Sequence, residues 1–294
     1  MTGATPLALA IAILSSVCFA VAHITARVGL RSIDARAGAA LSVPTAMVLF
    51  LAAAPFALDT AGFDLRALLV FAAVGVFFPS LVTIITFRSN ELLGPTVTSA
   101  VSGIAPLFAL LAASVFLGEQ VPSQATVSAL GVVAGVALLS WKKGAVRSGF
   151  VGWALLWPLS GAAVRGLVQT GVRAGLLIWP NAFAAGLVGY IMSSMVVIGA
   201  NRLRGGVRPR PTRRDRTWFA VTGVLNGSAV LLMYFALSMA PVWVVAPIVA
   251  SYPLLTALFG AALLHDEKLP LSALAGAGLT IAAVVYLLVS LGGG

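Results

Sequence analysis

Residues 242–264 read VWVVAPIVASYPLLTALFGAALL, a run of 23 residues without a charged side chain. An α-helix needs about 20 mostly apolar residues to cross the roughly 30 Å hydrocarbon core of a bilayer. Runs of this length recur along the whole chain, without the two-residue alternation of a membrane β-barrel. We therefore expect an all-α, polytopic membrane protein with ten transmembrane helices. The expected spans are residues 6–28, 37–58, 66–88, 95–117, 122–141, 150–172, 178–200, 217–239, 242–264 and 271–291.

The composition excludes most other classes of protein. Of the 294 residues, 60% are apolar and 9% are charged, whereas an average soluble domain carries about 25% charged residues. The net charge of +10 resembles that of a nucleic-acid-binding protein, but seven arginines lie within residues 201–216, between two apolar runs. We expect this segment, Arg202 to Arg216, to lie against anionic lipid headgroups and not to bind nucleic acid.

An internal repeat divides the chain at a nearly constant offset of 146 to 148 positions. Residues 27–30 read RVGL and residues 173–176 read RAGL, each at or near the end of a span. Pro106 lies inside the fourth span and Pro253 inside the ninth. The fourth and ninth spans are followed by GEQVP and DEKLP, which contain Glu119 and Glu267.

The repeat fixes the architecture that we expect. The two units are residues 1–146 and 147–294, with five spans each. Because five is odd, the second unit enters the membrane from the opposite face, and the two units form inverted repeats. Inverted repeats are a recurrent device of secondary transporters, with the solute near mid-membrane between the halves.

These motifs resemble those of the drug/metabolite transporter superfamily, in its ten-helix form with two EamA-type repeats. Such repeats have a first helix ending in Lys/Arg-x-Gly-Leu and a proline-bearing fourth helix leaving through Gly-Glu. Residues 233–237, MYFAL, resemble the family's aromatic-Ala-Leu signature in the third helix of a repeat. The first half departs from it at residues 87–90, FRSN, and has Phe19 where the family usually has Trp-Gly. The resemblance implies alternating-access transport, with export favoured, of a small organic metabolite, amino acid or drug.

The distribution of basic residues predicts the orientation in the cytoplasmic membrane. Fifteen of the 18 lysines and arginines fall on one face, Arg66 and Arg173 lie on the other, and Arg165 lies inside a span. The positive-inside rule places the richer face, with residues 201–216, in the cytoplasm and both termini outside. Members of the family usually have both termini inside, so this expectation runs against the resemblance.

Three polar residues near the first and sixth spans are candidates for solute binding. Arg165 is about two helical turns from Arg173, and an arginine at that depth must face the interior or a wet cavity. Its guanidinium could bind an anionic group of a solute. Alternatively, it could be satisfied by backbone carbonyls of neighbouring helices. Gln169 lies one turn away on the same face, and its repeat equivalent is His23. His23 could bind a solute or a proton, or it could be an interfacial residue. We expect Arg173 itself to reach the headgroups.

Four further residues complete the predicted site. Asn226 must be satisfied by another helix or by a ligand. Trp157, Tyr234 and Tyr252 are deep enough to stack on a solute or simply to pack. Tyr252 also lies between Pro247 and Pro253, which predict a discontinuity of the kind that lines transporter cavities.

Other functions remain as alternatives at this point. The same fold could serve a receptor or an assembly partner that transports nothing. A membrane-embedded enzyme is disfavoured because no paired acid and base occur within the spans. We expect no cofactor and no metal, since Cys18 is the single cysteine and the two histidines are far apart. The sequence leaves a monomer possible and the oligomeric state open.

Overall fold

The computed structural model describes residues 5–139, 152–202, 211–264 and 271–292, and every regular element within them is helical. The elements are α1 (Pro6–Gly29), α2 (Ala35–Ala57), α3 (Leu65–Gly75), η1 (Val76–Leu81), α4 (Val82–Ser102), α5 (Ala105–Leu117), α6 (Ser123–Leu139), η2 (Gly152–Leu155), α7 (Leu156–Ile178), α8 (Ala182–Arg202), α9 (Arg213–Met239), α10 (Val242–Val249), α11 (Tyr252–Leu264) and α12 (Leu271–Gly292).

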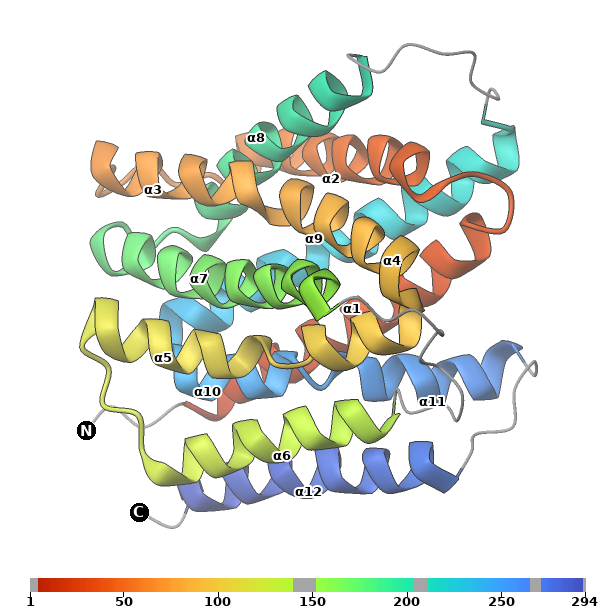
Figure 1. The fold of residues 1–294 in the computed structure, drawn as a ribbon. Coiled ribbons are helices and arrows are strands. Elements are labelled where there is room, and N and C mark those ends of the chain that lie inside the picture. Colours follow the sequence, from red (N-terminus) through yellow and green to blue (C-terminus); the bar gives the residue numbers. More distant parts are fainter. Residues whose placement is uncertain (1–4, 140–151, 203–210, 265–270, 293–294) are drawn as a thin grey trace.

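These helices follow the ten expected spans, and the chain is a multi-pass membrane protein. Six helices are long and apolar enough to cross a bilayer, and three shorter ones are apolar. The third span consists of α3, η1 and the beginning of α4, and α10 with α11 forms the ninth. One difference from the expectation is that helical residues join the third and fourth spans, because α4 continues from one into the other (Figure 1).

The two five-helix units are arranged antiparallel. In Figure 1, α1 starts at the end of the bundle where the chain begins, whereas α7, its equivalent, starts at the opposite end and runs back. The packing partners exchange in the same way: α1 packs along α9, and α7 packs along α3 and α4. The α2–α8 and α6–α12 pairs each join a helix to its own equivalent. This pairing confirms two inverted repeats.

Proline interrupts three of the spans. Pro79 follows Phe78, whose φ of −133° and ψ of 131° place it in the extended region, as expected for a residue before proline. The fourth span is divided between Ser102 and Ala105, just before Pro106, and the ninth is divided between Val249 and Tyr252, just before Pro253. The discontinuity predicted in the ninth span is thus confirmed, and it has an equivalent in the other repeat.

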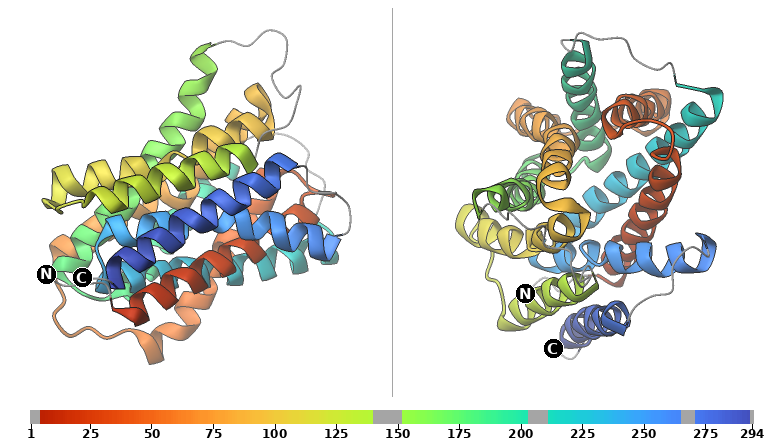
Figure 2. Two further views of the ribbon diagram at one scale, coloured as in Figure 1. Left: turned by 90° about the horizontal axis from the view of Figure 1, so that it is seen from below. Right: turned by 45° about the vertical axis from the view of Figure 1, so that its right-hand side comes forward.

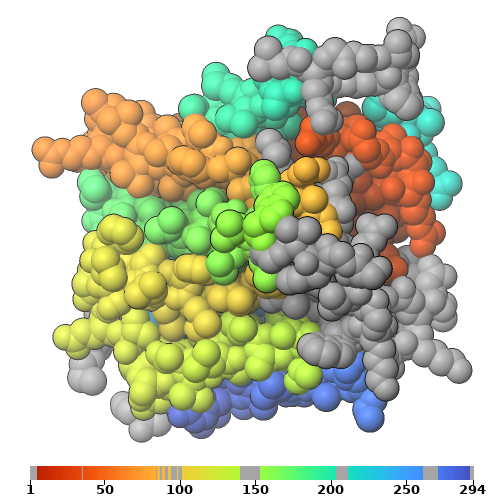
Figure 3. Space-filling model, viewed as in Figure 1, coloured from red at the N-terminus to blue at the C-terminus, as the bar shows by residue number. Residues whose placement is uncertain are grey.

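The bundle has two distinct ends. We call the end where α1 begins and α12 ends the terminal end, and the opposite end the arginine end (Figures 1 and 2). At the arginine end, Arg27 lies in the last turn of α1, Arg202 closes α8 and Arg213 opens α9. Between the two ends, helices α5 and α6 lie on the surface of the bundle that is turned to the viewer in Figure 3. On α5, for example, Leu111 is 62% exposed and Phe116 is 69% exposed, as expected for side chains that face lipid.

Glycines bring α6 and α12 into backbone contact. A Cβ atom at Gly276 would lie 2.5 Å from the carbonyl oxygen of Gly135 and 2.5 Å from the amide nitrogen of Leu139. A Cβ at Gly278, two residues along the same helix, would meet nothing within 4 Å. Small residues allow this kind of close approach between helices in a membrane.

We expect Gly276→Val to destabilise the protein by about 1–3 kcal/mol, because the added side chain has backbone on the facing helix to displace. Gly278→Val is the matched control, with the same change in helix propensity and no clash. The measurement is the midpoint of thermal unfolding in detergent. Equal midpoints for the two variants would contradict the α6–α12 packing.

Candidate functional site

Arg165 lies near the middle of α7 and is bonded to α4 of the other repeat. Its Nη2 donates to Thr86 Oγ1 at 3.2 Å. The Thr86 hydroxyl donates in turn to the carbonyl of Val82 at 2.7 Å, which leaves its lone pairs for the guanidinium. Among the described side chains no carboxylate pairs with Arg165, and this is its one hydrogen bond. A guanidinium carries five N–H donors, so most of them are available to a ligand.

His23 of α1 and Tyr252 of α11 form a stacked pair. Their ring centroids are 4.9 Å apart and the ring planes differ by 9°. Phe19, one turn earlier on α1, also packs against Tyr252, and the two ring centroids are 5.8 Å apart. One further bond joins α1 to the break before α11, because the hydroxyls of Ser16 and Ser251 are 3.2 Å apart. The break between α10 and α11 is therefore held directly against the middle of α1.

Arg165 lies near enough to the His23–Tyr252 pair to act on it electrostatically. The positive charge of Arg165 acts on the His23 imidazole, although α1 and α7 make no extensive contact with each other. His23 is exposed, and Arg165 and Tyr252 are half-buried. Three residues that the sequence singled out, on α1, α7 and α11, thus lie within electrostatic or stacking range of one another.

Among the described residues, packing is tighter at the terminal end of the site than at the arginine end. Every residue of α10 except Trp243 is buried, and this helix packs against α5, α1 and α7. Its continuation α11 is only half-buried from Thr256 to Gly260. Moreover, among the described residues, α11 makes no contact with α4 comparable to that between α10 and α5. Because α5 and α4 form the fourth span as α10 and α11 form the ninth, the described residues of the two repeats pack more closely at the terminal end than at the arginine end.

Glu119 and Arg173 hold the terminal end together. Glu119 accepts the Val242 backbone N–H at 3.0 and 3.2 Å, at the start of α10, and lies 3.8 Å from Arg173 Nε. Arg173 Nη1 donates to the carbonyls of Leu237 at 2.7 Å and Ser238 at 3.2 Å, near the end of α9. The expectation that Arg173 reaches the headgroups is therefore wrong, because helix ends within the protein take up its donors.

Glu119 lies in the loop between α5 and α6, yet it is largely removed from water. Burial raises the pKa of its carboxyl above the ordinary value, while the Val242 N–H and the Arg173 charge oppose this shift. The carboxylate also sits at the N-terminus of α10, where the helix dipole favours a negative charge. The repeat equivalent, Glu267, lies outside the described residues.

The other predicted site residues are not part of this group. Asn226 is satisfied by another helix, since its Oδ1 accepts the Tyr190 hydroxyl at 2.8 Å. Tyr234 is 2% exposed within the same core. Trp157 is half-buried near the start of α7, and its carbonyl accepts the Ser160 hydroxyl. Gln169 differs from these, because its Oε1 is buried and has no hydrogen-bond donor among the described residues.

Two contributors were not found from the sequence. Tyr190 was one aromatic residue in a long apolar run, and nothing in its spacing indicated a bond to Asn226. Thr86 was equally inconspicuous, although it is the residue that holds Arg165. Within the described part of the chain, no group of three histidine, cysteine, aspartate or glutamate residues could hold a metal ion.

Comparison with known proteins agrees with this fold. The model of the EamA-like transporter family matches residues 6–141 and again residues 149–289. No curated protein matches the chain. A crystal structure described only as "Crystal structure of protein" superimposes with a TM-score of 0.79 at 15% identity, over 96% of each chain, and therefore shares the fold. The two family matches together cover nearly the whole sequence, and the chain belongs to the EamA-like transporter family, whose members carry small molecules across membranes.

Proposed function

We propose that the protein is a secondary transporter that moves a small organic solute with an anionic group by alternating access. The observation that carries the proposal is the placement of the stacked His23 and Tyr252 rings within electrostatic range of Arg165, on three helices of two antiparallel repeats. Export is the direction that the family resemblance favours.

The chemistry of the group favours an anion with a planar part. Arg165 has unoccupied donors in a planar fork that matches carboxylate or phosphate. Two half-helices, α5 and α11, begin at the breaks near mid-depth, and the positive ends of their dipoles lie there. The stacked His23 and Tyr252 rings supply a flat surface for an aromatic or conjugated portion of the solute. Gln169 Oε1 is an acceptor within one turn of Arg165.

The asymmetry between the two ends supports alternating access. The terminal end is closed by α10 and the Glu119–Arg173 pair, whereas α11 stands apart from α4. Since the repeats are equivalent, exchange of these two arrangements would close the arginine end and open the terminal end. With the arginine end in the cytoplasm, the present conformation is open inward, and both termini lie outside.

Counterflow in liposomes tests this function. Proteoliposomes preloaded with a mixture of carboxylated and phosphorylated metabolites, amino acids and drugs are diluted into trace labelled solutes. We expect transient accumulation of at least one anionic solute above that in empty liposomes, because a carrier exchanges one solute for another. No accumulation across the panel would contradict transport and favour the receptor alternative.

A further inference from the structure

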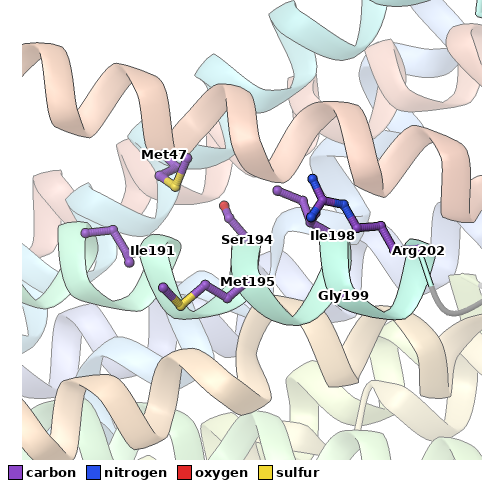
Figure 4. A pocket seen from close by; sticks show the side chains of 7 residues that line it. All are labelled: Met47, Ile191, Ser194, Met195, Ile198, Gly199 and Arg202. Carbon is purple, nitrogen blue, oxygen red and sulfur yellow. The ribbon is translucent and has the colours of Figure 1, made fainter.

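A groove separate from the candidate site lies between α2 and α8. It has a volume of about 430 Å³ and is lined by Met47 of α2 together with residues of α8 (Figure 4). The lining residues are Met47, Ile191, Ser194, Met195, Ile198, Gly199 and Arg202. Helices α2 and α8 form the edge of the bundle opposite α6 and α12 (Figures 1 and 2). The groove therefore faces away from α11 and its stacked pair.

Two polar groups in the groove are without partners. Ser194 is fully buried, and its Oγ points towards α2 without a hydrogen bond among the described residues (Figure 4). Leaving a buried hydroxyl unpaired is costly. Arg202 is exposed and has neither a hydrogen bond nor an ion pair within the described chain. Its side chain bends back along α8 to the groove (Figure 4).

The groove has the length of one membrane leaflet. From Ile191 to Arg202, α8 rises by about 16 Å at about 1.5 Å per residue. This is close to half of the roughly 30 Å hydrocarbon core. Since Arg202 closes α8 at the arginine end, the apolar part of the groove extends from that interface to about mid-depth.

We propose that this groove binds one anionic phospholipid. The guanidinium of Arg202 binds the phosphate through charge-assisted hydrogen bonds, and one acyl chain lies along Ile191, Met195 and Met47. An anionic lipid fits the charge of Arg202, which no carboxylate among the described residues compensates, and the exposed Arg213 that opens α9 at the same end.

Native mass spectrometry of the detergent-solubilised full chain tests the proposal with two probes. These are phosphatidylglycerol and phosphatidylcholine with the same acyl chains, added at increasing ratios. We expect one phosphatidylglycerol to bind about tenfold more tightly than phosphatidylcholine, because only the former leaves a net negative charge for Arg202. Equal binding of the two lipids would overturn the proposal.

Two variants and a matched control locate the site. Arg202→Gln removes the cation and should weaken phosphatidylglycerol binding about tenfold. Gly199→Trp fills the groove, and because a Cβ there meets nothing within 4 Å, the helix itself tolerates the substitution. It should abolish binding of the lipid. Arg213→Gln, which removes an exposed cation at the same end outside the groove, should leave binding unchanged.

Two other results of these experiments would contradict lipid binding in the groove. Unchanged binding in both Arg202→Gln and Gly199→Trp would place the lipid elsewhere and overturn the proposal. A dimer of the wild type that Gly199→Trp converts to a monomer would assign the groove to a second copy of the chain, and would also overturn it. Gel filtration of each variant verifies that it is folded.

Discussion

Replacing Arg165 with alanine is expected to reduce counterflow of the anionic solute by roughly 30- to 150-fold, while thermal stability changes little. The guanidinium has one hydrogen bond within the described protein, to Thr86, so its removal breaks little within the protein. Losing charge-assisted hydrogen bonds to an anion costs about 2–3 kcal/mol, and each 1.4 kcal/mol corresponds to about a factor of ten. The measurement is the initial rate of counterflow at several solute concentrations.

Two controls separate charge from position. Arg165→Lys keeps the charge but loses the planar fork, and we expect it to retain part of the transport rate. Arg66→Gln removes an exposed cation from α3 at the terminal end, and we expect the wild-type rate. If Arg165→Ala transports at the wild-type rate, the residue does not belong to the solute site.

The second large effect is expected at the closed end. Arg173→Ala leaves the carbonyls of Leu237 and Ser238 without their donor and leaves Glu119 without its cation. The two side chains of the pair are only 16% and 12% exposed, so water compensates little. We expect a loss of about 2–3 kcal/mol in the closed conformation, seen as a lower midpoint of thermal unfolding and a slower counterflow.

A double-mutant cycle shows whether the pair acts as a unit. Glu119→Ala, Arg173→Ala and the double variant are compared, and the double variant should be destabilised by about 1 kcal/mol less than the sum of the two single effects. Arg66→Gln is again the control for loss of charge at this end. Additive effects of Glu119→Ala and Arg173→Ala would mean that the two side chains do not cooperate in closing the terminal end.

The sequence predicts local features well because proline and apolar length act locally. Pro253 removes a backbone donor and restricts the preceding residue, so the break between α10 and α11 follows from residues 247–253 alone. The number of spans is likewise predicted from local sequence, because it depends only on the length of each apolar run. The antiparallel arrangement follows from the repeat offset together with an odd number of spans in each half.

Contacts between distant helices could not be predicted in this way. The Arg173 side chain was expected at the headgroups because its position along α7 suggests the interface, but its acceptors lie more than sixty residues away. Likewise, Asn226 was an open choice between a helix and a ligand until Tyr190 of α8 was found beside it. Of the predicted site, His23, Arg165 and Tyr252 are brought together, whereas Tyr234 is enclosed in the core.

The central claim is that water and solute reach mid-membrane between the two repeats from one end. It is tested most directly by labelling His23→Cys, in a Cys18→Ser background, with a membrane-impermeant thiosulfonate in vesicles of each orientation. We predict fast labelling from the arginine end, slow labelling from the terminal end, and protection by the transported solute. Leu111→Cys is the control, because it is exposed to lipid and should stay unlabelled. If His23→Cys were as unreactive as Leu111→Cys from both faces, no aqueous opening would exist there, and the account of a carrier would be contradicted.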